Sequence, residues 1–334
     1  MYQAGICGTG VITNVWKQKA SHRLDDRNLA AKGSAMGHAG EILQGAVRDG
    51  TSVRRVLVSL PAPQLCSKAE FHATAADGLR VFPAWKEKSL RACRLALAEF
   101  GCAETNCVVN ISSNIPPCIG LGSSTADCVA VIRAIASWCG THPAEEAVAR
   151  IAQQAESSSD STMFEDGLVA FAHCDGEVHE YLAGPLPNLR MLVVQDPARA
   201  GGIETSLVRR PVYTSAQLDR VEEMLSRLRG SVRDSDLQGI GEVATASAVL
   251  NQQYFPKSHF DKMLQSAEET FALGVAAAHS GTVLALLYSS EGEAEQKISA
   301  VRRKLAERQL AVTLELSSRP QPYVEFTAGW DRRT

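Results

Sequence analysis

Apolar and polar residues alternate along the first half of the chain in a way that predicts both strands and helices. Val53 to Pro61 combines β-branched residues with alternation, which is typical of a strand, and Lys68 to Ala75 is expected to be its neighbour. From Lys86 to Phe100 apolar residues recur at helical spacing, and Gly101 stands where such a helix would end. A short strand is expected at Cys107–Ser112.

A loop rich in proline and glycine follows, over residues 113–122. The next segment, Ser123 to Gly140, is so apolar that we expect a buried helix, and Pro143 to Glu156 has the pattern of a further helix. The first half therefore predicts an α+β arrangement in which a glycine-rich loop opens a helix.

The second half begins near residue 185, where the segment GPLPNLR indicates a boundary. Amphipathic helices are expected at 215–229, 235–250, 258–273 and 291–308, and strands at Leu189–Gln195, Thr282–Tyr288, 311–317 and 322–327. This order resembles a ferredoxin-like α+β module.

Length and local pattern together suggest three parts. A chain of 334 residues is long enough for one large or two medium domains. Residues 1–30 are irregular apart from a short β-like run at Gly10–Trp16, and their glycines do not have the spacing of a dinucleotide loop. We therefore expect an N-terminal extension (1–30), an N-terminal domain (31–184) and a C-terminal domain (185–334).

Composition narrows the class of protein. Apolar residues make up 45% and charged residues 21%, as in a globular protein with a core. The formal net charge is −3 and no long run of one sign occurs, which argues against a nucleic-acid or membrane-surface partner. No apolar stretch approaches a membrane span, and the start lacks a secretion pattern. The nine cysteines form no C-x-x-C, so we expect reduced thiols and a cytoplasmic location.

The strongest chemical signal lies between Ile115 and Asp127, in the segment IPPCIGLGSSTAD. Gly120 and Gly122 allow a polyphosphate to approach the backbone closely, and hydroxyl side chains follow where a helix begins. A helix N-terminus has free amides and the positive end of a dipole, which suits an anion. The lysine of a Walker loop is missing. The alternative is a helix-capping turn that binds no ligand.

This loop resembles the P-x-x-x-G-L-G-S-S-x-A motif of the GHMP kinases, a family that includes homoserine and mevalonate kinases. Its extension is similar to the propanediol-utilisation L-threonine kinase branch. Two further segments resemble family motifs in the right order: GHAGEILQG at 37–45 and GVAAAHSGTV at 274–283. Met36 and His38 depart from the first motif, in which proline and serine are expected.

The resemblance implies a two-domain GHMP-kinase-like fold, with an N-terminal α/β domain and a C-terminal ferredoxin-like α+β domain. It also implies ATP and Mg²⁺ as cofactors. The residues expected at the nucleotide phosphates are Pro117, Gly120, Leu121, Gly122, Ser123, Ser124 and Thr125. Ser124 and Glu156 are the implied metal ligands. A solvated surface position is the alternative for Glu156.

Asp160 is the candidate catalytic residue, because it follows the helix that ends at Glu156 and matches an aspartate of the threonine-kinase branch. It would orient or deprotonate the acceptor hydroxyl; a turn aspartate bonded to its own backbone is the alternative. Glu41 and Gln44 either shape a pocket or cap a helix start. The full set of candidate substrate-binding residues is His38, Glu41, Gln44, His279 and Ser280.

Together these features predict an ATP-dependent kinase that phosphorylates the hydroxyl of a small amino acid, with L-threonine or a close analogue as acceptor. Homoserine or another amino alcohol is the alternative within the same chemistry. A non-catalytic sensor of ATP and a metabolite is the alternative of another class. A homodimer is compatible with the sequence, and a dehydrogenase is disfavoured because no strand–GxGxxG–helix unit occurs.

Overall fold

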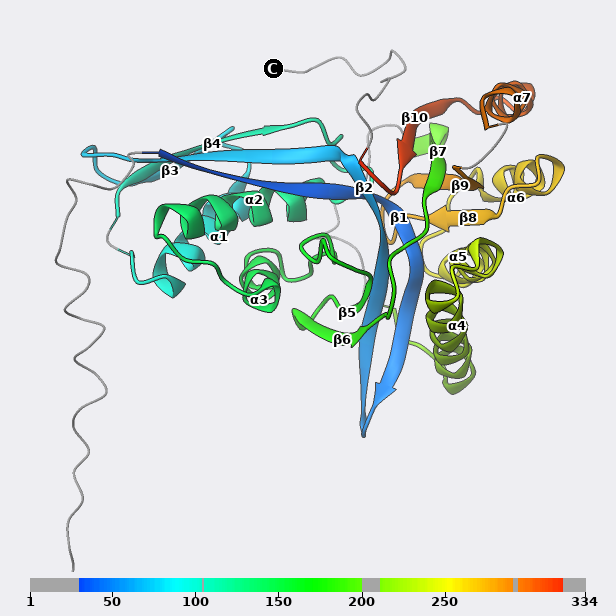
Figure 1. Cartoon of the computed structure of the whole chain (residues 1–334), viewed down its shortest axis with the longest axis horizontal. Coiled ribbons are helices and arrows are strands. Elements are labelled where there is room, and N and C mark those ends of the chain that lie inside the picture. Colours follow the sequence, from blue (N-terminus) through cyan, green and yellow to red (C-terminus); the bar gives the residue numbers. More distant parts are fainter. Residues whose placement is uncertain (1–29, 104, 200–210, 291–293, 321–334) are drawn as a thin grey trace, which may run out of the picture.

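The computed structural model describes residues 30–103, 105–199, 211–290 and 294–320 (Figure 1). The β-like run at Gly10–Trp16 and the strand expected at 322–327 lie outside these residues. The described chain forms one ten-stranded sheet with helices packed against it. None of the helices in these ranges combines the length and the apolar character that a membrane crossing requires.

The two longest strands of this sheet form an antiparallel hairpin. It consists of β1 (Ala30–Asp49) and β2 (Ser52–Ala73). The sequence predicted two neighbouring strands within the region of β2, which was wrong because they form one strand, and it assigned no element to the region of β1. Pro61 and Pro63 suggest a strand end because proline cannot donate to a ladder. The structure accommodates them at a register shift, where β1 residues 36 and 37 pair with β2 residues 66 and 62.

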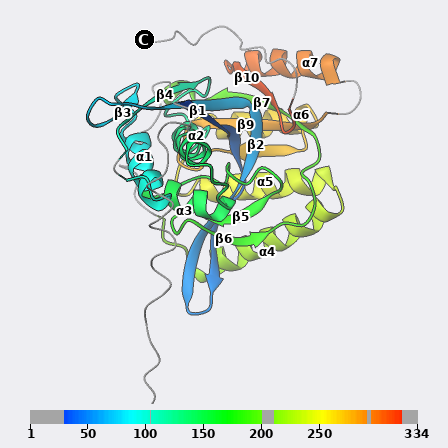
Figure 2. The same cartoon turned by 60° about the vertical axis from the view of Figure 1, so that its left-hand side comes forward.

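Three helices cover one face of the N-terminal half, as Figures 1 and 2 show. They are α1 (Glu87–Glu99), α2 (Ser123–Trp138) and α3 (Glu145–Glu156), close to the predicted bounds. The predicted strand β4 (Cys107–Ser113) lies between β2 and β3 (Leu79–Phe82). Twelve of the sixteen residues of α2 are buried, so the helix that follows the glycine-rich loop is held rigidly in the core.

The C-terminal half is a four-stranded antiparallel sheet with helices. Its strands are β7 (Leu189–Gln195), β8 (Gly274–Ala277), β9 (Val283–Ser289) and β10 (Val312–Ser317), in the spatial order β10-β7-β9-β8. Helices α4 (Ser215–Arg233), α5 (Leu237–Asn251) and α6 (Phe260–Glu269) precede β8, and α7 (Ala294–Glu307) follows β9. This βαββαβ order confirms the ferredoxin-like expectation. The strand β8 was not among the elements expected from the sequence.

The two halves join at the centre of the sheet. β1 pairs with β8 through Glu41 and Ala277, so the first and third sequence motifs meet there. Two short strands that the sequence did not predict, β5 (Val169–Ala172) and β6 (Glu177–Tyr181), lie beside β2, and a 3₁₀ turn, η1, covers Pro197–Arg199. The chain therefore has a mixed sheet and the α+β class that was predicted.

Candidate active site

The glycine-rich loop leads directly into α2. Gly120 (φ 90°) and Gly122 (φ 75°) both have left-handed backbone conformations, which favour glycine. Gly122 is the residue before α2, and no side chain caps the amides of the first helical turn. Free amides and the positive end of the helix dipole therefore lie at this loop, an arrangement that suits an anion.

The third motif packs against this loop from the C-terminal half. Thr282 donates its backbone N–H to the carbonyl of Ile119 at 2.8 Å. A Cβ atom on Gly281 would lie 2.4 Å from Cα of Gly120, so the two backbones touch. The loop shape thus depends on a segment about 160 residues further along the chain, and only glycine fits at the contact.

The first motif reaches the same loop from β1. The backbone N–H of His38 donates to the carbonyl of Leu121 at 3.2 Å. The register of β1 is irregular between Met36 and Leu43, which bends the strand at this point. The three motifs, distant in sequence, therefore surround one site.

A cluster of one imidazole and two carboxylates lies beside the loop. His38 Nε2 is 3.2 Å from Asp160 Oδ2, and His38 Nδ1 is 3.6 Å from Glu41 Oε1. The side chain of Glu41 is fully buried, and among the described residues neither of its carboxylate oxygens has a hydrogen-bond partner. A Cβ atom on Gly122 would lie 3.4 Å from Asp160 Oδ2, so this carboxylate faces the start of α2.

Charge and burial shift the titration of all three groups. Burial alone would lower the pKa of His38, but the charges of Glu41 and Asp160 raise it to about 9. Burial raises the pKa of Glu41 above its usual range. Burial also acts to raise the pKa of Asp160, yet the charge and hydrogen bond of His38 outweigh it and lower that pKa. Asp160 is therefore an ionised carboxylate beside an imidazolium at neutral pH.

The orientation of His38 is consistent with both of its protonation states. Nε2 carries the proton that is donated to Asp160 in either state. Nδ1 accepts from the backbone N–H of Gly40 at 3.1 Å when the ring is neutral, and faces Glu41 when it is protonated. His38 is thus a central member of the site and not a surface residue.

Glu156 and Asp160 are linked through Thr125. The Thr125 hydroxyl lies 2.7 Å from Glu156 Oε2 and 3.2 Å from Asp160 Oδ2. The side chain of Glu156 is 2% exposed, which excludes the alternative of a solvated surface position. Lys88 Nζ approaches Glu156 Oε1 at 3.4 Å. The hydroxyl of Thr125, predicted to face the nucleotide, instead orients these two carboxylates.

The oxygen donors at the start of α2 suit a hard cation. Ser124 is half-buried in the first turn, and its hydroxyl interacts with the buried carboxylate of Glu156. Mg²⁺ prefers such oxygen ligands and keeps several waters. The atoms of His38, Glu41 and Asp160 also lie within 4.8 Å of one another, but this set includes an imidazole nitrogen. The predicted pair of Ser124 and Glu156 fits Mg²⁺ better.

Gln44 and His279 form a second polar pair beside the cluster. Gln44 Nε2 donates to the carbonyl of Ala277 at 3.0 Å, so its Oε1 accepts from His279 Nδ1 at 2.8 Å. Burial, together with His173, Lys257 and other charges, lowers the pKa of His279 to about 3. His279 is therefore neutral, with its proton on Nδ1. Gln44 lies on a strand and caps no helix.

The remaining candidates differ in how far they are buried. Pro117 is exposed in the loop, Leu121 is buried and offers only its backbone, and Ser123 and Ser280 are half-buried. The sequence reasoning missed Lys88 beside Glu156, and it also missed His173, whose ring lies 5.2 Å from that of His279. A lysine two residues into a predicted helix carries no local signal of such a role.

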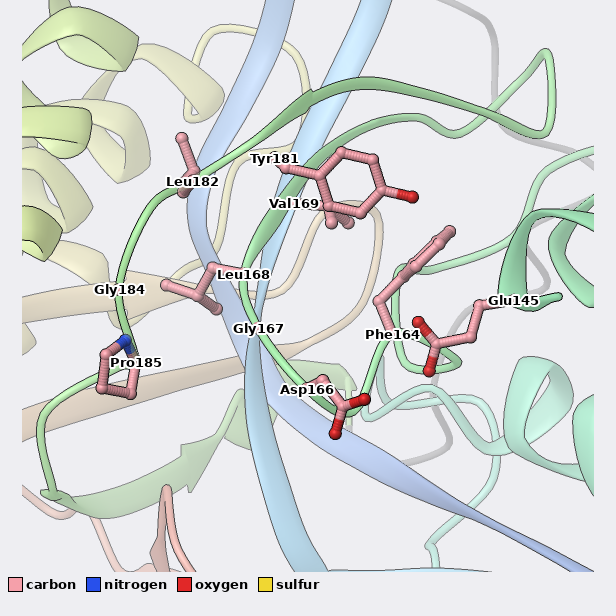
Figure 3. Close-up of a pocket in the computed structure, with 10 residues that line it drawn as sticks. All are labelled: Glu145, Phe164, Asp166, Gly167, Leu168, Val169, Tyr181, Leu182, Gly184 and Pro185. Carbon is pink, nitrogen blue, oxygen red and sulfur yellow. The ribbon is translucent and has the colours of Figure 1, made fainter.

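A cavity of about 370 Å³ lies elsewhere, among the start of α3, the 164–168 loop and β5–β6 (Figure 3). Its lining includes Phe164, Tyr181 and the carboxylates of Glu145 and Asp166, and none of the predicted site residues. In Figure 3 the Glu145 side chain lies near Phe164, and the Asp166 side chain lies further from the Phe164 ring. No basic side chain lines the cavity, and the helix N-terminus beside it carries the acidic Glu145, so the chemistry of phosphate binding favours the loop before α2.

Two family models match the chain. The GHMP kinases N terminal domain covers residues 87–167, and the GHMP kinases C terminal domain covers residues 228–307. Among curated proteins, the L-threonine kinase of Salmonella typhimurium is 28% identical over 60% of this chain, and that of Citrobacter freundii is 29% identical over 54%. The aligned regions span 65% and 61% of the length of these relatives.

Solved structures show the same fold. Homoserine kinase from Cytophaga hutchinsonii aligns with a TM-score of 0.62 and 17% identity, over 88% of this chain and 96% of its own. The complex of MDDEF with MVAPP, AMPPCP and magnesium aligns with a TM-score of 0.58 and 15% identity, over 86% and 97%. The chain thus matches the N-terminal and C-terminal domain models of the GHMP kinases, and it shares its fold with the solved homoserine kinase.

Proposed function

We propose that the protein is an ATP-dependent kinase that transfers the γ-phosphoryl group of ATP to the hydroxyl of an amino acid, with L-threonine as the first candidate acceptor. The observation that carries this proposal is the position of Asp160. Its carboxylate faces the uncapped N-terminus of α2, so an anion cradle and a group that orients a hydroxyl lie side by side. The names of the two curated relatives support threonine.

In the proposed reaction, the acceptor hydroxyl donates its hydrogen bond to Asp160. The hydroxyl oxygen forms a bond to the γ-phosphorus, and the bond to the β–γ bridging oxygen breaks with its electron pair left on ADP. The hydroxyl proton passes to Asp160. An aspartate with a lowered pKa is a weak base, but a loose transition state releases this proton late, so orientation is its main contribution.

The cofactor proposal includes Mg²⁺, which would neutralise charge on the transferred phosphates. Ser124 and Glu156 would hold it, because their oxygens lie at the start of α2 where the phosphates would bind. AMPPCP and magnesium in the MDDEF complex are consistent with a nucleotide and this metal in the shared fold. His38, as a cation beside Asp160, would keep that carboxylate ionised.

The charge of His38 predicts an alkaline limit to activity. The pKa of about 9 lies above the ordinary value of 6.5, so the folded enzyme holds the proton at neutral pH and loses it as pH rises through about 9. We expect kcat/KM for the acceptor to fall above that pH. H38N should lower kcat/KM about 10- to 100-fold at pH 7.5, and its kcat/KM should fall less steeply above pH 9 than that of the wild type.

The pH profile is best measured for the wild type, for H38N and for H142N, a control at an exposed histidine. The amino group of the substrate titrates in the same region, so the difference between variants is the informative quantity. If kcat/KM of H38N falls at alkaline pH as that of the wild type does, the titration of His38 is not the cause of the fall.

The function itself is tested by ADP release with a panel of acceptors: L-threonine, L-homoserine, L-serine and 1-amino-2-propanol. We expect release well above that with ATP alone for at least one hydroxy amino acid, and loss of this release with EDTA. Phosphorus NMR should identify a phosphomonoester on the acceptor hydroxyl. If ATP binds but no acceptor stimulates ADP release, the non-catalytic sensor is the better description.

A further inference from the structure

Arg55 on β2 is a cation without an acidic partner in the part of the chain that the structure describes. It is half-buried, and one of its terminal nitrogens, Nη2, donates to the carbonyl of Pro211 at 3.1 Å. Its Nε atom is buried, and among the described residues it has no hydrogen-bond partner. Within the same ranges Arg55 forms no ion pair. The adjacent Arg54 is different, because it pairs with Asp49 at 2.6 Å and with Glu177 at 2.8 Å.

Arg55 lies on the side of the hairpin that faces the site. Alternation along β2 places it on the same face as Leu57 and Ser59, and Ser59 pairs across the hairpin with Glu41. The pKa of His279 is lowered by burial and further by the charges of His173, Lys257 and Arg55, while Asp160 opposes them. His279 therefore lies within electrostatic range of both Arg55 and Asp160.

An unpaired, partly buried guanidinium is unfavourable unless an anion approaches it. The guanidinium of Arg55 holds its N–H donors in one plane, and two of them can bind the two oxygens of a carboxylate at once. Lys257 is the other cation near His279, but it is a point charge whose Nζ already contacts the carbonyl of Phe255 at 3.4 Å. Burial also lowers the pKa of Lys257 to about 8, which weakens it as a fixed positive charge.

We propose that Arg55 binds the carboxylate of the amino-acid acceptor while the acceptor hydroxyl faces Asp160. This inference rests on the proposed function and adds to it the residue that selects amino acids over amino alcohols. A zwitterion bound in this way would have its negative group at the hairpin and its reactive hydroxyl at the start of α2.

The test compares R55M with the matched control R54M, using L-threonine (or the best acceptor of the panel) and 1-amino-2-propanol, which lacks the carboxylate. R55M should raise the KM for the amino acid about 100-fold or more, because it removes the partner of a buried charge. The KM for ATP and the kcat/KM for 1-amino-2-propanol should stay within about threefold. R54M should resemble the wild type.

R55K keeps the positive charge but loses the planar pair of donors, so it should give an intermediate KM for the amino acid. Circular dichroism should show that each variant is folded. Three results would overturn the inference. R55M could raise the KM for ATP and not that for the amino acid, or R54M could raise the KM for the amino acid as much as R55M does. K257M could instead be the variant that raises the KM for the amino acid and leaves kcat/KM for 1-amino-2-propanol unchanged. If wild-type protein releases no ADP with any acceptor, the proposed function fails first. If it is active and R55M is unchanged, only the role of Arg55 fails.

Discussion

Replacing Asp160 with asparagine is expected to lower kcat about 10³-fold or more while the KM for ATP changes only a few-fold. Asparagine keeps the size of the side chain and can still contact His38 and Thr125, whose atoms lie 3.2 Å from the carboxylate oxygen. It loses the negative charge that, in the proposed reaction, orients the acceptor hydroxyl and accepts its proton. The loss should therefore concern the chemical step and not nucleotide binding.

Steady-state ADP release for wild type, D160N and D166N measures this effect. Asp166 is an exposed aspartate in a nearby loop, outside the site, and its variant should keep normal kcat. Turnover by D160N within a few-fold of the wild type would remove Asp160 from the mechanism. A large rise in the KM for ATP with unchanged kcat would place it at the nucleotide instead.

A single added methyl group at Gly281 is expected to damage ATP binding from outside the phosphate loop. The new Cβ atom would lie 2.4 Å from Cα of Gly120 and 2.4 Å from the carbonyl oxygen of Ile119. Both are backbone atoms, so neither can move aside like a flexible side chain, and the loop must shift. We expect the KM for ATP to rise about 10- to 100-fold and the free energy of unfolding to fall by about 1–3 kcal/mol.

Gly230 in α4 provides the control, because a Cβ atom there meets no atom within 4 Å. G230A should keep the wild-type KM for ATP and gain up to about 1 kcal/mol of stability, since alanine is the better helix former. Thermal unfolding and the KM for ATP should be measured for both variants. If G281A and G230A behave alike, the third motif does not support the loop in the way described.

Much of the site chemistry could be read from local sequence. The loop of Gly120 and Gly122 and the start of α2 at Ser123 are adjacent in the chain, so spacing alone predicted an uncapped helix N-terminus. The helices that end at Glu99 and Glu156 were also predicted closely, because apolar periodicity is a local property. Glu156 and Asp160 follow from that helix end.

The strands β1 and β8 could not be read in this way. Both contain many small residues, with four glycines between positions 33 and 45 of β1, and such segments have low strand propensity. They become strands because β2 and β9 pair with them and helices pack on them. The sequence reasoning also missed that the Thr125 hydroxyl contacts both Glu156 and Asp160, and that Lys88 pairs with Glu156. Each of these contacts depends on a partner that is distant in the sequence.

The sequence by itself predicted the type of chemistry from a glycine-rich loop, the helix after it and a nearby aspartate, all encoded within about 45 consecutive residues. Only the tertiary structure decided which side chains surround that loop. His38, Glu41 and His279 are brought to it by strand pairing and by a bulge in β1. Strand register and burial are properties of the whole sheet, so the pKa of His38 and the lack of a partner for Arg55 Nε among the described residues depend on the complete fold.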